Sequence, residues 1–235
     1  MIYLERSFQV MKGRSAVSLS DELRDLHENR FGNLPDDIRT IMERGDRDLA
    51  ASGIAGQALG VGAQAPRFTL PSATGAQVAL DDLLAAGPVV LTFYRGAWCP
   101  YCNLALRALQ RHHDAIAARG ARLVAVSPQI PDESLTLAEK HALDFDVLSD
   151  IGADVAKQYG LAFDLSDELG ALYDRLGFDL ARVNAGHSRT LPLPATYVID
   201  RTGAVRWAFV DTDYKHRAEP SDILAALDGL VAPGV

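Results

Sequence analysis

An apolar run that leads directly into a pair of cysteines and then into a helical pattern constrains the fold most. Residues 88–94 read PVVLTFY, a continuous β-prone stretch of the kind found in a strand buried on both faces. Cys99 and Cys102 follow after a short turn, and they are the only cysteines among the 235 residues. Apolar side chains then recur at helical spacing until Gly120 ends the pattern. The helical face comprises Cys102, Leu106, Leu109 and Ile116.

The surrounding pattern predicts an α/β fold with a central sheet flanked by helices. An apolar stretch at 122–126 follows the helix, and this order of strand, helix and strand predicts a right-handed parallel crossover. Residues 160–192 are expected to contain one helix and a polar insertion that shapes access to the site. The other expected elements are helices over 132–143, 153–159, 166–176 and 221–230, and strands over 67–70, 77–80, 145–148, 195–200 and 205–210.

We divide the chain into an N-terminal helical extension with a linker, residues 1–60, and a main domain, residues 61–235. Ser18 is expected to cap a first helix, and a second begins near Pro35. The Gly- and Ala-rich residues 50–62 are expected to be a linker. Both helices are too short to fold alone, so their apolar stripes need either the main domain or a second subunit, as in a homodimer.

The composition excludes several classes of protein. Lys and Arg number 23 against 31 Asp and Glu, and the net charge of −8 disfavours binding to nucleic acid. No apolar run is long enough to cross a membrane, and charges in the first 14 residues interrupt any signal-peptide core. We therefore expect a cytoplasmic protein, in whose reducing surroundings two cysteines do not serve as a structural staple.

The position of the cysteines at the start of a helix predicts redox chemistry. Exposed backbone N–H groups and the helix dipole stabilise a thiolate there and lower its pKa. Cys99 and Cys102 lie within one turn and can close a disulfide, and Pro100 suits the first turn because it lacks an N–H. Trp98 is expected to form an apolar wall that shapes partner access.

The order of CxxC, proline, strand, hairpin and final helix is typical of a thioredoxin-like fold. Pro194 stands directly before the strand expected at 195–200. In that fold a proline at this place is cis and packs against the CxxC turn, so we expect a cis peptide at Pro194. Tyr214, Arg217 and Glu219 follow the hairpin. The plain interpretation is a polar loop that caps the last helix, and the alternatives are a dimer contact or the rim of the active site.

The chain resembles the peroxiredoxin-like branch of the alkyl hydroperoxide reductase/thiol-specific antioxidant (AhpC/TSA) family, which has a thioredoxin fold. The resemblance spans residues 61–210. It rests on the segments VGAQAPRFTLPSATG, PVVLTFYRGAWCPYCNLAL, RLVAVSP, FDVLSD, AKQYG and PLPATYVIDRTGAVRWAF. The family places a Thr three residues before its peroxide-attacking Cys, a Pro earlier in the same loop and an Arg near a later strand.

Alignment with this family pattern assigns the peroxidatic position to Cys102. Cys99 stands where the family has its Thr, Arg95 where it has its Pro, and Pro194 where it has its Arg. The peroxide-activating set is therefore expected to be incomplete. Arg95 either supplies positive charge close to Cys102 or lies on the surface.

The resemblance implies a thiol peroxidase. Cys102 would attack a hydroperoxide and Cys99 would resolve the product as a disulfide, which thioredoxin, glutaredoxin or glutathione would reduce. The expected binding residues for substrate or partner are Arg95, Trp98, Pro100, Tyr101 and Pro194. No cofactor and no metal are expected.

Two alternatives to a peroxidase stay open. The first is a thioredoxin-like protein disulfide oxidoreductase, in which Cys99 is exposed at the helix start and attacks a substrate disulfide. The second is a metal-binding redox chaperone that uses the dithiol together with His187. Paired substitutions of Cys99 and Cys102 are expected to separate the first alternative from the peroxidase.

Overall fold

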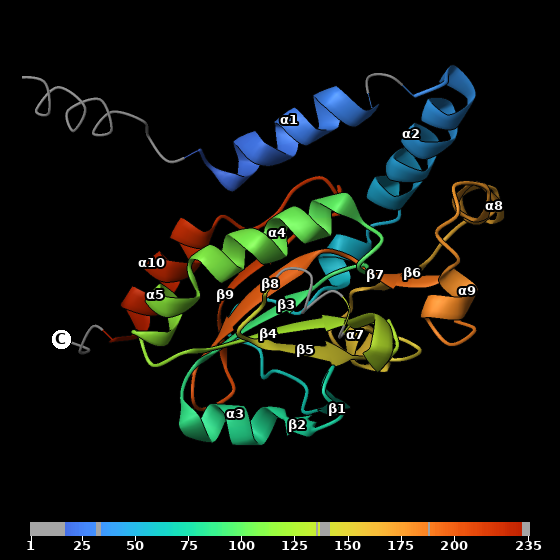
Figure 1. Cartoon of the computed structure of the whole chain (residues 1–235). Coiled ribbons are helices and arrows are strands. Elements are labelled where there is room, and N and C mark those ends of the chain that lie inside the picture. The colour runs from blue at the N-terminus through green and yellow to red at the C-terminus, as the bar shows by residue number, and fades with distance from the viewer. Residues whose placement is uncertain (1–16, 32–33, 135, 137–141, 188, 232–235) are drawn as a thin grey trace, which may run out of the picture.

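The structure is a computed structural model that describes residues 17–31, 34–134, 136, 142–187 and 189–231. Its centre is a five-stranded sheet in the order β5-β4-β3-β8-β9 (Figure 1). The strands are β3 (Val89–Phe93), β4 (Arg122–Ser127), β5 (Asp146–Ser149), β8 (Ala195–Ile199) and β9 (Val205–Val210). β4 runs parallel to β3 and β5, whereas β8 is antiparallel to β3 and β9. The predicted central strand, parallel crossover and C-terminal hairpin are confirmed.

Two apolar cores, one on each face of the sheet, explain why the run at β3 is continuously apolar. Val90 belongs to the core beneath α4, whereas its neighbour Leu91 belongs to the core on the opposite face. The first core is covered by α4 (Pro100–Arg111), α5 (His113–Ala117) and α10 (Pro220–Val231). The second is covered by α3 (Leu80–Ala86) and α7 (Asp154–Gln158), with the hairpin of β1 (Thr69–Pro71) and β2 (Gln77–Ala79) beside them.

The helix predicted to run from the cysteines to Gly120 is in fact two helices. The break is at His112, whose φ and ψ of −110° and 4° end α4. Its backbone N–H donates to the carbonyl of Leu109, three residues back, and its ring Nδ1 lies 2.9 Å from the carbonyl oxygen of Ala108. The change of direction still lets Ile116 reach the same core as α4.

Residues 160–192 contain more regular structure than expected. α8 (Asp167–Arg175) was predicted, but the antiparallel pair of β6 (Ala162–Asp164) with β7 (Thr190–Pro192) and the helix α9 (Leu180–Val183) were not. These pieces have only three or four residues, which is too short for a recognisable period. Of the helix expected at 132–143, residues 135 and 137–141 lie outside the described residues, and 132–134 and 136 are helical.

The prediction of a cis peptide at Pro194 is wrong, because the described residues contain no cis bond. The chain runs extended from β7 through Leu193 and Pro194 into β8. The Leu193 N–H donates to the Leu161 carbonyl, and the Pro194 carbonyl accepts from Asp211. A trans peptide lets the chain continue in one direction at this point. The Leu193 N–H and the Pro194 carbonyl can then form their hydrogen bonds to two different segments.

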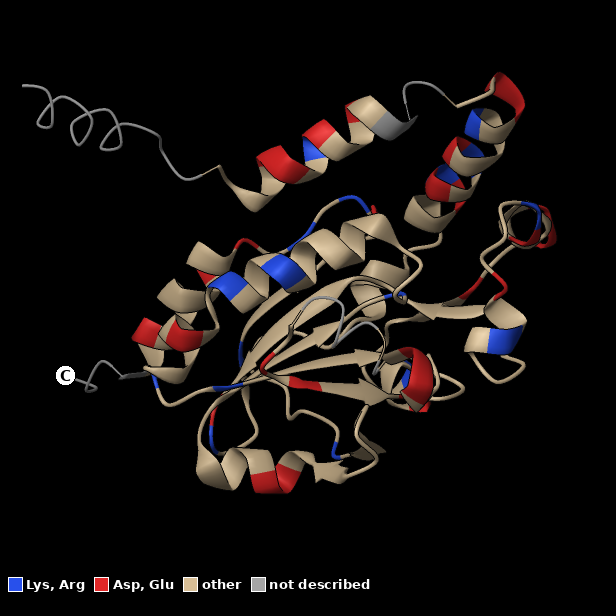
Figure 2. Ribbon diagram, viewed as in Figure 1, with Lys and Arg blue, Asp and Glu red and all other residues tan. Residues whose placement is uncertain are grey.

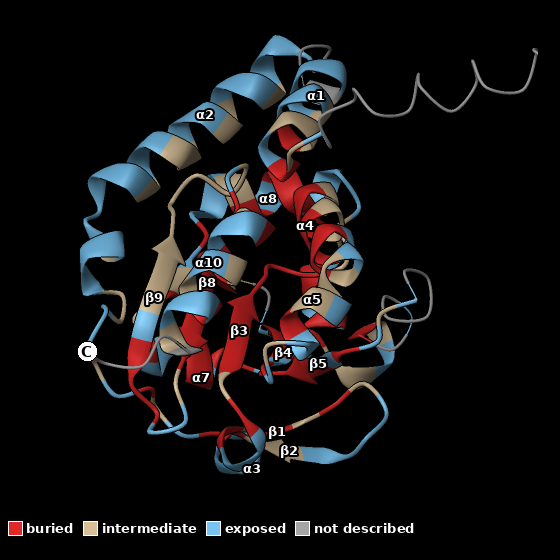
Figure 3. Ribbon diagram, turned by 90° about the vertical axis from the view of Figure 1, so that its left-hand side faces the viewer, coloured by how far each residue is buried: buried red, intermediate tan, exposed pale blue. Residues whose placement is uncertain are grey.

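The N-terminal helices α1 (Leu19–Phe31) and α2 (Asp36–Ala51) are attached to the main domain in different ways. Leu19 and Leu23 of α1 are buried in the same core as α4, and the Glu219 carboxylate accepts the N–H groups of Leu19 and Ser20. Ser18 Oγ accepts from the Asp21 N–H, as the predicted cap requires. No residue of α2 is buried, and the helix is exposed along most of its length (Figure 3). The homodimer through these helices stays a prediction.

The segment expected to be a linker is packed against the main domain. The 3₁₀ helix η2 (Ile54–Gln57) lies in it, the Leu59 N–H donates to the Tyr159 carbonyl, and the Gly62 N–H donates to the Val205 carbonyl. Gly160 has a φ of +68°, and a Cβ there would lie 2.2 Å from the Gln57 carbonyl oxygen, so only glycine allows this close approach.

Charged side chains gather on the outer helices and leave the central sheet almost free of them (Figure 2). Both signs occur along α1 and α2. Within the described part of the chain, no helix has the length and apolarity needed to cross a membrane.

Candidate active site

The two cysteines lie at the junction of β3 and α4, as predicted. Cys99 caps the helix, and Cys102 lies in its first turn. Both are free thiols, and only 2% of Cys99 and 0% of Cys102 is exposed. The expectation of an exposed Cys99 is therefore wrong. The cysteines belong to the same large apolar core as Leu19 and Leu23 of α1, and His27 of α1 contacts Tyr101 at the start of α4.

Hydrogen bonds hold the turn before the cysteines in one conformation. The Cys99 N–H donates to the Gly96 carbonyl, and the Ala97 N–H donates to Gln129 Oε1 at 2.6 Å. Asn103 Nδ2 donates to the Ala97 carbonyl at 2.9 Å. Gly96 has a φ of +147°, and a Cβ there would lie 2.4 Å from Trp98 Nε1. The turn thus requires glycine so that Trp98 can fold back over it.

The surroundings of Cys102 favour its thiolate. Burial alone would raise the pKa of Cys102. A hydrogen bond from the Cys99 thiol, the positive charge of Arg217 and the backbone N–H of Arg95 overcome this effect and hold the pKa well below its ordinary value. Arg217 Nη2 lies 3.1 Å from Cys102 Sγ. Cys102 is thus the thiolate of the pair.

The same contacts have the opposite effect on Cys99. Burial and the hydrogen bond that its thiol donates to Cys102 raise its pKa well above the ordinary value, although Arg95 and Arg217 oppose the shift. The opposite directions of the two pKa shifts favour Cys102 as the thiolate of the pair.

Arg217 comes from the loop between β9 and α10, and its guanidinium is held from both sides. Nη1 donates to the carbonyls of Tyr214 and His216, while Nη2 faces Cys102. The residue is 9% exposed, and among the described residues no carboxylate forms an ion pair with it. The loop caps the last helix through the Glu219 carbonyl, which accepts from Asp222 and Ile223, and its Arg217 also contacts the cysteine pair.

Arg95 is buried beside the cysteines and does not lie on the surface. Only 3% of it is exposed. Its guanidinium carbon lies 4.5 Å from the ring centroid of Tyr214, 5.0 Å from that of Trp98 and 5.5 Å from that of Tyr173. Arg95 Nη2 donates a hydrogen bond to Tyr173 Oη. Three aromatic faces and one phenol thus take the place of a carboxylate partner.

Trp98 and Tyr101 lie beside the cysteines and pack against aromatic rings that come from distant segments of the chain. Trp98 forms the predicted apolar wall, with its ring centroid 5.6 Å from that of Tyr173 and 5.1 Å from that of Phe178. Tyr101 is buried, its ring centroid lies 5.5 Å from that of Tyr214, and its Oη lies 3.0 Å from His27 Nδ1 of α1. The rings of α8, α4 and the loop after β9 therefore form one wall around the turn.

The other two predicted site residues occupy plainer positions. Pro100 is the first residue of α4, as predicted from its missing N–H. Pro194 lines a small cavity of about 20 Å³ together with Arg95, Tyr173 and Tyr214. The structure thus brings Pro194 to the Arg95 side of the site.

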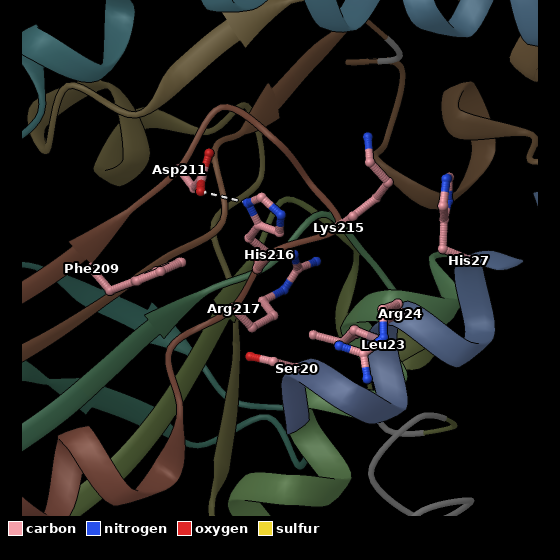
Figure 4. A pocket seen from close by; sticks show the side chains of 9 residues that line it. All are labelled: Ser20, Leu23, Arg24, His27, Phe209, Asp211, Lys215, His216 and Arg217. Carbon is pink, nitrogen blue, oxygen red and sulfur yellow. Dashed lines mark hydrogen bonds and ion pairs between the residues drawn. The ribbon is translucent and has the colours of Figure 1, made fainter. Parts of the chain in front are cut away.

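A larger cavity of about 460 Å³ opens on the other side of the site, between α1 and the loop after β9 (Figure 4). It is lined by Ser20, Leu23, Arg24, His27, Phe209, Asp211, Lys215, His216 and Arg217. The side chain of Arg217 faces this cavity and also contacts Cys102 Sγ. A small molecule in the cavity would meet the guanidinium before it meets the sulfur.

Residues 61–208 match the model of the AhpC/TSA family. The chain belongs to this family. It is 28% identical over 163 residues to peroxiredoxin Q, chloroplastic, of Triticum aestivum, a match that covers 69% of this chain and 64% of that protein. It is 33% identical over 110 residues to peroxiredoxin Bcp of Escherichia coli strain K12, covering 47% of this chain and 69% of that protein. The predicted family resemblance is confirmed.

A solved structure agrees with this assignment. The crystal structure of peroxidoxin BcpB from Mycobacterium tuberculosis has a TM-score of 0.58 and 25% sequence identity, and the match covers 73% of this chain and 98% of that one. The thioredoxin-like, peroxiredoxin-like fold predicted from the sequence is therefore correct.

The expectation that the family's peroxide-activating set is incomplete stays a prediction, but the structure adds a cation that was not predicted from the sequence. Pro194 does take the place of the family's Arg at the later strand. However, Arg217 brings a guanidinium to Cys102 from a different segment, 115 residues along the chain. The sequence offered one indication that a distant arginine would reach Cys102, namely the absence of the family's arginine at position 194. A buried thiolate without a neighbouring cation would be costly in free energy.

The described residues contain no group of three or more His, Cys, Asp or Glu side chains that could hold a metal ion. His187, the third ligand of the chaperone hypothesis, lies against Gly152 in the loop before α7. The dithiol therefore has no third metal ligand in the part of the chain that the structure describes.

Proposed function

We propose that the protein is a thiol peroxidase that reduces hydroperoxides through a cycle of Cys102 and Cys99. The Cys102 thiolate attacks one oxygen of the peroxide, an S–O bond forms and the O–O bond breaks. The sulfur is oxidised to a sulfenic acid, and the other oxygen takes a proton and leaves as water or an alcohol. Cys99 then displaces hydroxide from that sulfur, which gives a disulfide.

The contact between Arg217 Nη2 and Cys102 Sγ at 3.1 Å carries this proposal. The guanidinium keeps the sulfur ionised, and a second N–H of the same planar group is suited to bind the peroxide oxygen that becomes negative as the O–O bond breaks. The low pKa of Cys102 and the high pKa of Cys99 favour Cys102 as the first attacker.

The cavity that Arg217 lines suggests how the peroxide enters. It lies beside α1, and Leu23 and Phe209 give it apolar walls. Its charged lining residues are of both signs, namely Arg24, Lys215, Arg217 and Asp211. We infer that the peroxide approaches Cys102 from this side.

The disulfide between Cys99 and Cys102 would form at a buried helix start. The reductant is expected to be thioredoxin, glutaredoxin or glutathione, as the family assignment suggests. Because both cysteines are buried, either a protein reductant or a small thiol requires this end of the molecule to open before it reaches the disulfide. A cytoplasmic location and a homodimer through the N-terminal helices stay predictions.

Stopped-flow oxidation of three reduced proteins tests the proposal. We expect the wild type and Cys99→Ser to consume hydrogen peroxide rapidly, and Cys99→Ser to accumulate a sulfenic acid on Cys102 that dimedone traps. Cys102→Ser is expected to react no faster than a free thiol. A wild type that reacts at the rate of a free thiol would exclude a peroxidase.

A protein disulfide oxidoreductase is the second candidate, and the CPYC turn at the start of α4 favours it. It requires Cys99 as an accessible nucleophile, but Cys99 is buried and its pKa is raised. Incubation of Cys102→Ser with a disulfide-bonded protein discriminates between the two. A mixed disulfide at Cys99 would favour the oxidoreductase, whereas an unreacted Cys99 would favour the peroxidase.

A further inference from the structure

The direction of the Arg217 side chain depends on the backbone of its own loop. Its Nη1 donates to the carbonyls of Tyr214 and His216, and its Nη2 lies 3.1 Å from Cys102 Sγ. A planar guanidinium holds its N–H groups in fixed directions, so the positions of the two carbonyls decide where Nη2 points. Contacts that hold residues 214–216 in place therefore also hold the cation against the sulfur.

Helix α2 contacts this loop through Asp46. Lys215 Nζ lies 2.9 Å from Asp46 Oδ2, 2.8 Å from Asp213 Oδ1 and 4.8 Å from the ring centroid of Tyr214. The side chains of Asp46 and Lys215 are 29% and 21% exposed, whereas those of the two ion pairs between α2 and α8 are 46% to 65% exposed. An ion pair that is shielded from water is screened less, so the contact with the loop is the firmer attachment of α2.

Helix α1 contacts the same loop on the other side of Arg217. Glu219 Oε1 accepts from the Ser20 N–H at 2.6 Å, and Oε2 accepts from the Leu19 N–H at 3.2 Å. A carboxylate is favourable there, because the first N–H groups of a helix have no partner in the helix and lie at the positive end of its dipole. Lys215 and Glu219 are each two residues from Arg217, so the N-terminal helices hold the chain just before and just after the arginine.

The remaining contacts of the loop do not involve the N-terminal helices. The ring of Tyr214 packs against Tyr101 and the Arg95 guanidinium. Two backbone N–H groups of the loop donate to the carboxylates of Asp211 and Asp213. The loop therefore keeps part of its fold without α1 and α2, and loss of their contacts should loosen it without unfolding the protein.

We propose that Asp46 and Glu219 are positioning residues, through which the N-terminal helices hold the Arg217 guanidinium against Cys102. This proposal rests on the peroxidase cycle proposed above, in which Arg217 acts on the sulfur that attacks the peroxide. Loss of either contact lets the carbonyls that orient the guanidinium move, and Nη2 then spends less time at the sulfur. The N-terminal helices thus contribute to the first chemical step as well as to the cover over α4.

The sign of the charge on Asp46 makes its removal a directional test. Removal of a negative charge would by itself favour a thiolate nearby and lower the pKa of Cys102. Displacement of Arg217 has the opposite effect, because the thiolate loses the cation that its sulfur contacts. In Asp46→Asn we therefore expect the pKa of Cys102 to rise by about 0.5 or more and oxidation by hydrogen peroxide to slow about threefold to tenfold.

Two measurements on the full chain give these values. The ultraviolet absorbance of the thiolate against pH reports the pKa of Cys102, in a Cys99→Ser background so that one thiol remains. Stopped-flow mixing with hydrogen peroxide reports the rate in the same background. Asp46→Glu keeps a carboxylate and should restore both values. Asp48→Asn removes an exposed charge from the same helix and should leave both unchanged.

An Arg217→Gln background separates positioning from general loosening. Without the guanidinium there is nothing for Asp46 to position, so Asp46→Asn should then neither raise the pKa of Cys102 nor slow oxidation further. A substitution that merely loosens the structure would act equally in both backgrounds.

Glu219→Gln tests the other helix. It keeps the backbone carbonyl that caps α10 and weakens the side-chain contact with α1, so both values should change in the same direction as in Asp46→Asn. If Asp46→Asn fails to fold, this variant decides. A pKa of Cys102 that is unchanged or lowered in both variants, or equal effects with and without Arg217, would overturn the proposal. The absorbance titration needs no peroxide, so a wild type that does not react with peroxide would exclude the peroxidase while the titration still tests the positioning.

Discussion

Arg217 and Arg95 give two cysteines of one motif different chemistry. Both thiols are buried, and both begin the same helix, so burial and the helix dipole alone do not distinguish them. Cys102 has a guanidinium 3.1 Å from its sulfur and receives a hydrogen bond from Cys99. Cys99 donates that bond and keeps its proton. These contacts support the proposed order of attack, in which Cys102 reacts first.

Removal of the Arg217 guanidinium should slow the first step. In Arg217→Gln the Cys102 thiolate loses an ionic hydrogen bond worth about 1.5–3 kcal/mol, so we expect peroxide oxidation to fall about tenfold to a hundredfold at neutral pH. Stopped-flow kinetics measure this rate. Arg182→Gln, which removes an exposed arginine of α9, is the control and should leave it unchanged. An unchanged rate in Arg217→Gln would contradict the assigned role.

The Cys99 hydrogen bond can be tested through the pH dependence of Cys102. The pKa of Cys102 is lowered, so alkylation of the wild type by iodoacetamide should stay fast at neutral pH and decline only as the pH falls through that low pKa. Cys99→Ser keeps a donor and should retain this profile. Cys99→Ala removes the donor, so the decline should move to higher pH. Identical profiles of the two variants would show that Cys99 does not donate this bond.

The element that most affects access to the cysteines is α1, because it covers the start of α4. Leu19 and Leu23 lie in the apolar cluster that contains both sulfurs, and His27 reaches the hydroxyl of Tyr101. Glu219, four residues before the buried Ile223, accepts the first N–H groups of α1 and ties it to α10. Access to the site and packing of α1 are therefore coupled.

Truncation of Leu23 should loosen α1. Leu23→Ala removes a buried side chain at a cost of about 2–5 kcal/mol, which we expect to appear as a lower melting temperature and faster alkylation of the buried thiols. Thermal unfolding and iodoacetamide kinetics measure the two effects. Asp25→Ala on the exposed face of α1 is the control. Slow alkylation in a destabilised Leu23→Ala would mean that α1 does not limit access.

The whole molecule consists of a sheet with an apolar core on each face and a pair of N-terminal helices. The two helices are attached to the main domain by different kinds of interaction. α1 is held mainly by buried leucines, whereas α2 has no buried residue and is held by ion pairs together with the partly buried Leu49. Arg44 of α2 binds Glu168 at 2.8 Å, Asp37 binds Arg175, and Asp46 binds Lys215 beside the site. Exposed ion pairs are screened by salt, but burial of leucine is not weakened by it.

Salt should therefore separate the two helices in hydrogen exchange. At about 1 M salt, where the screening length is about 3 Å, we expect amide exchange in α2 to accelerate while exchange in α1 and the sheet stays slow. Hydrogen–deuterium exchange with mass spectrometry at low and high salt measures this. Glu168→Gln at low salt should reproduce part of the effect. Uniform exchange in α1 and α2 at both salt concentrations would contradict this description.

The sequence by itself determined the strand at β3, the helix start that carries Cys99 and Cys102, the parallel crossover and the closing hairpin. These features depend on local periodicity, on caps and on side chains close together in the chain. The same local information identified the cysteine pair and its redox character. It also predicted the family, because the family's motifs are contiguous segments.

Only the tertiary structure decided which cations reach the sulfurs. Arg217 is 115 residues from Cys102, and no local pattern distinguishes an arginine that turns inward from one in a polar loop. The burial of Arg95 depends on Tyr173 and Tyr214, which belong to other elements. The peptide bond at Pro194 is trans, which the motif order alone did not predict. Electrostatic effects act through space. The proposed order in which the two thiols react therefore depends on residues that only the tertiary structure brings together.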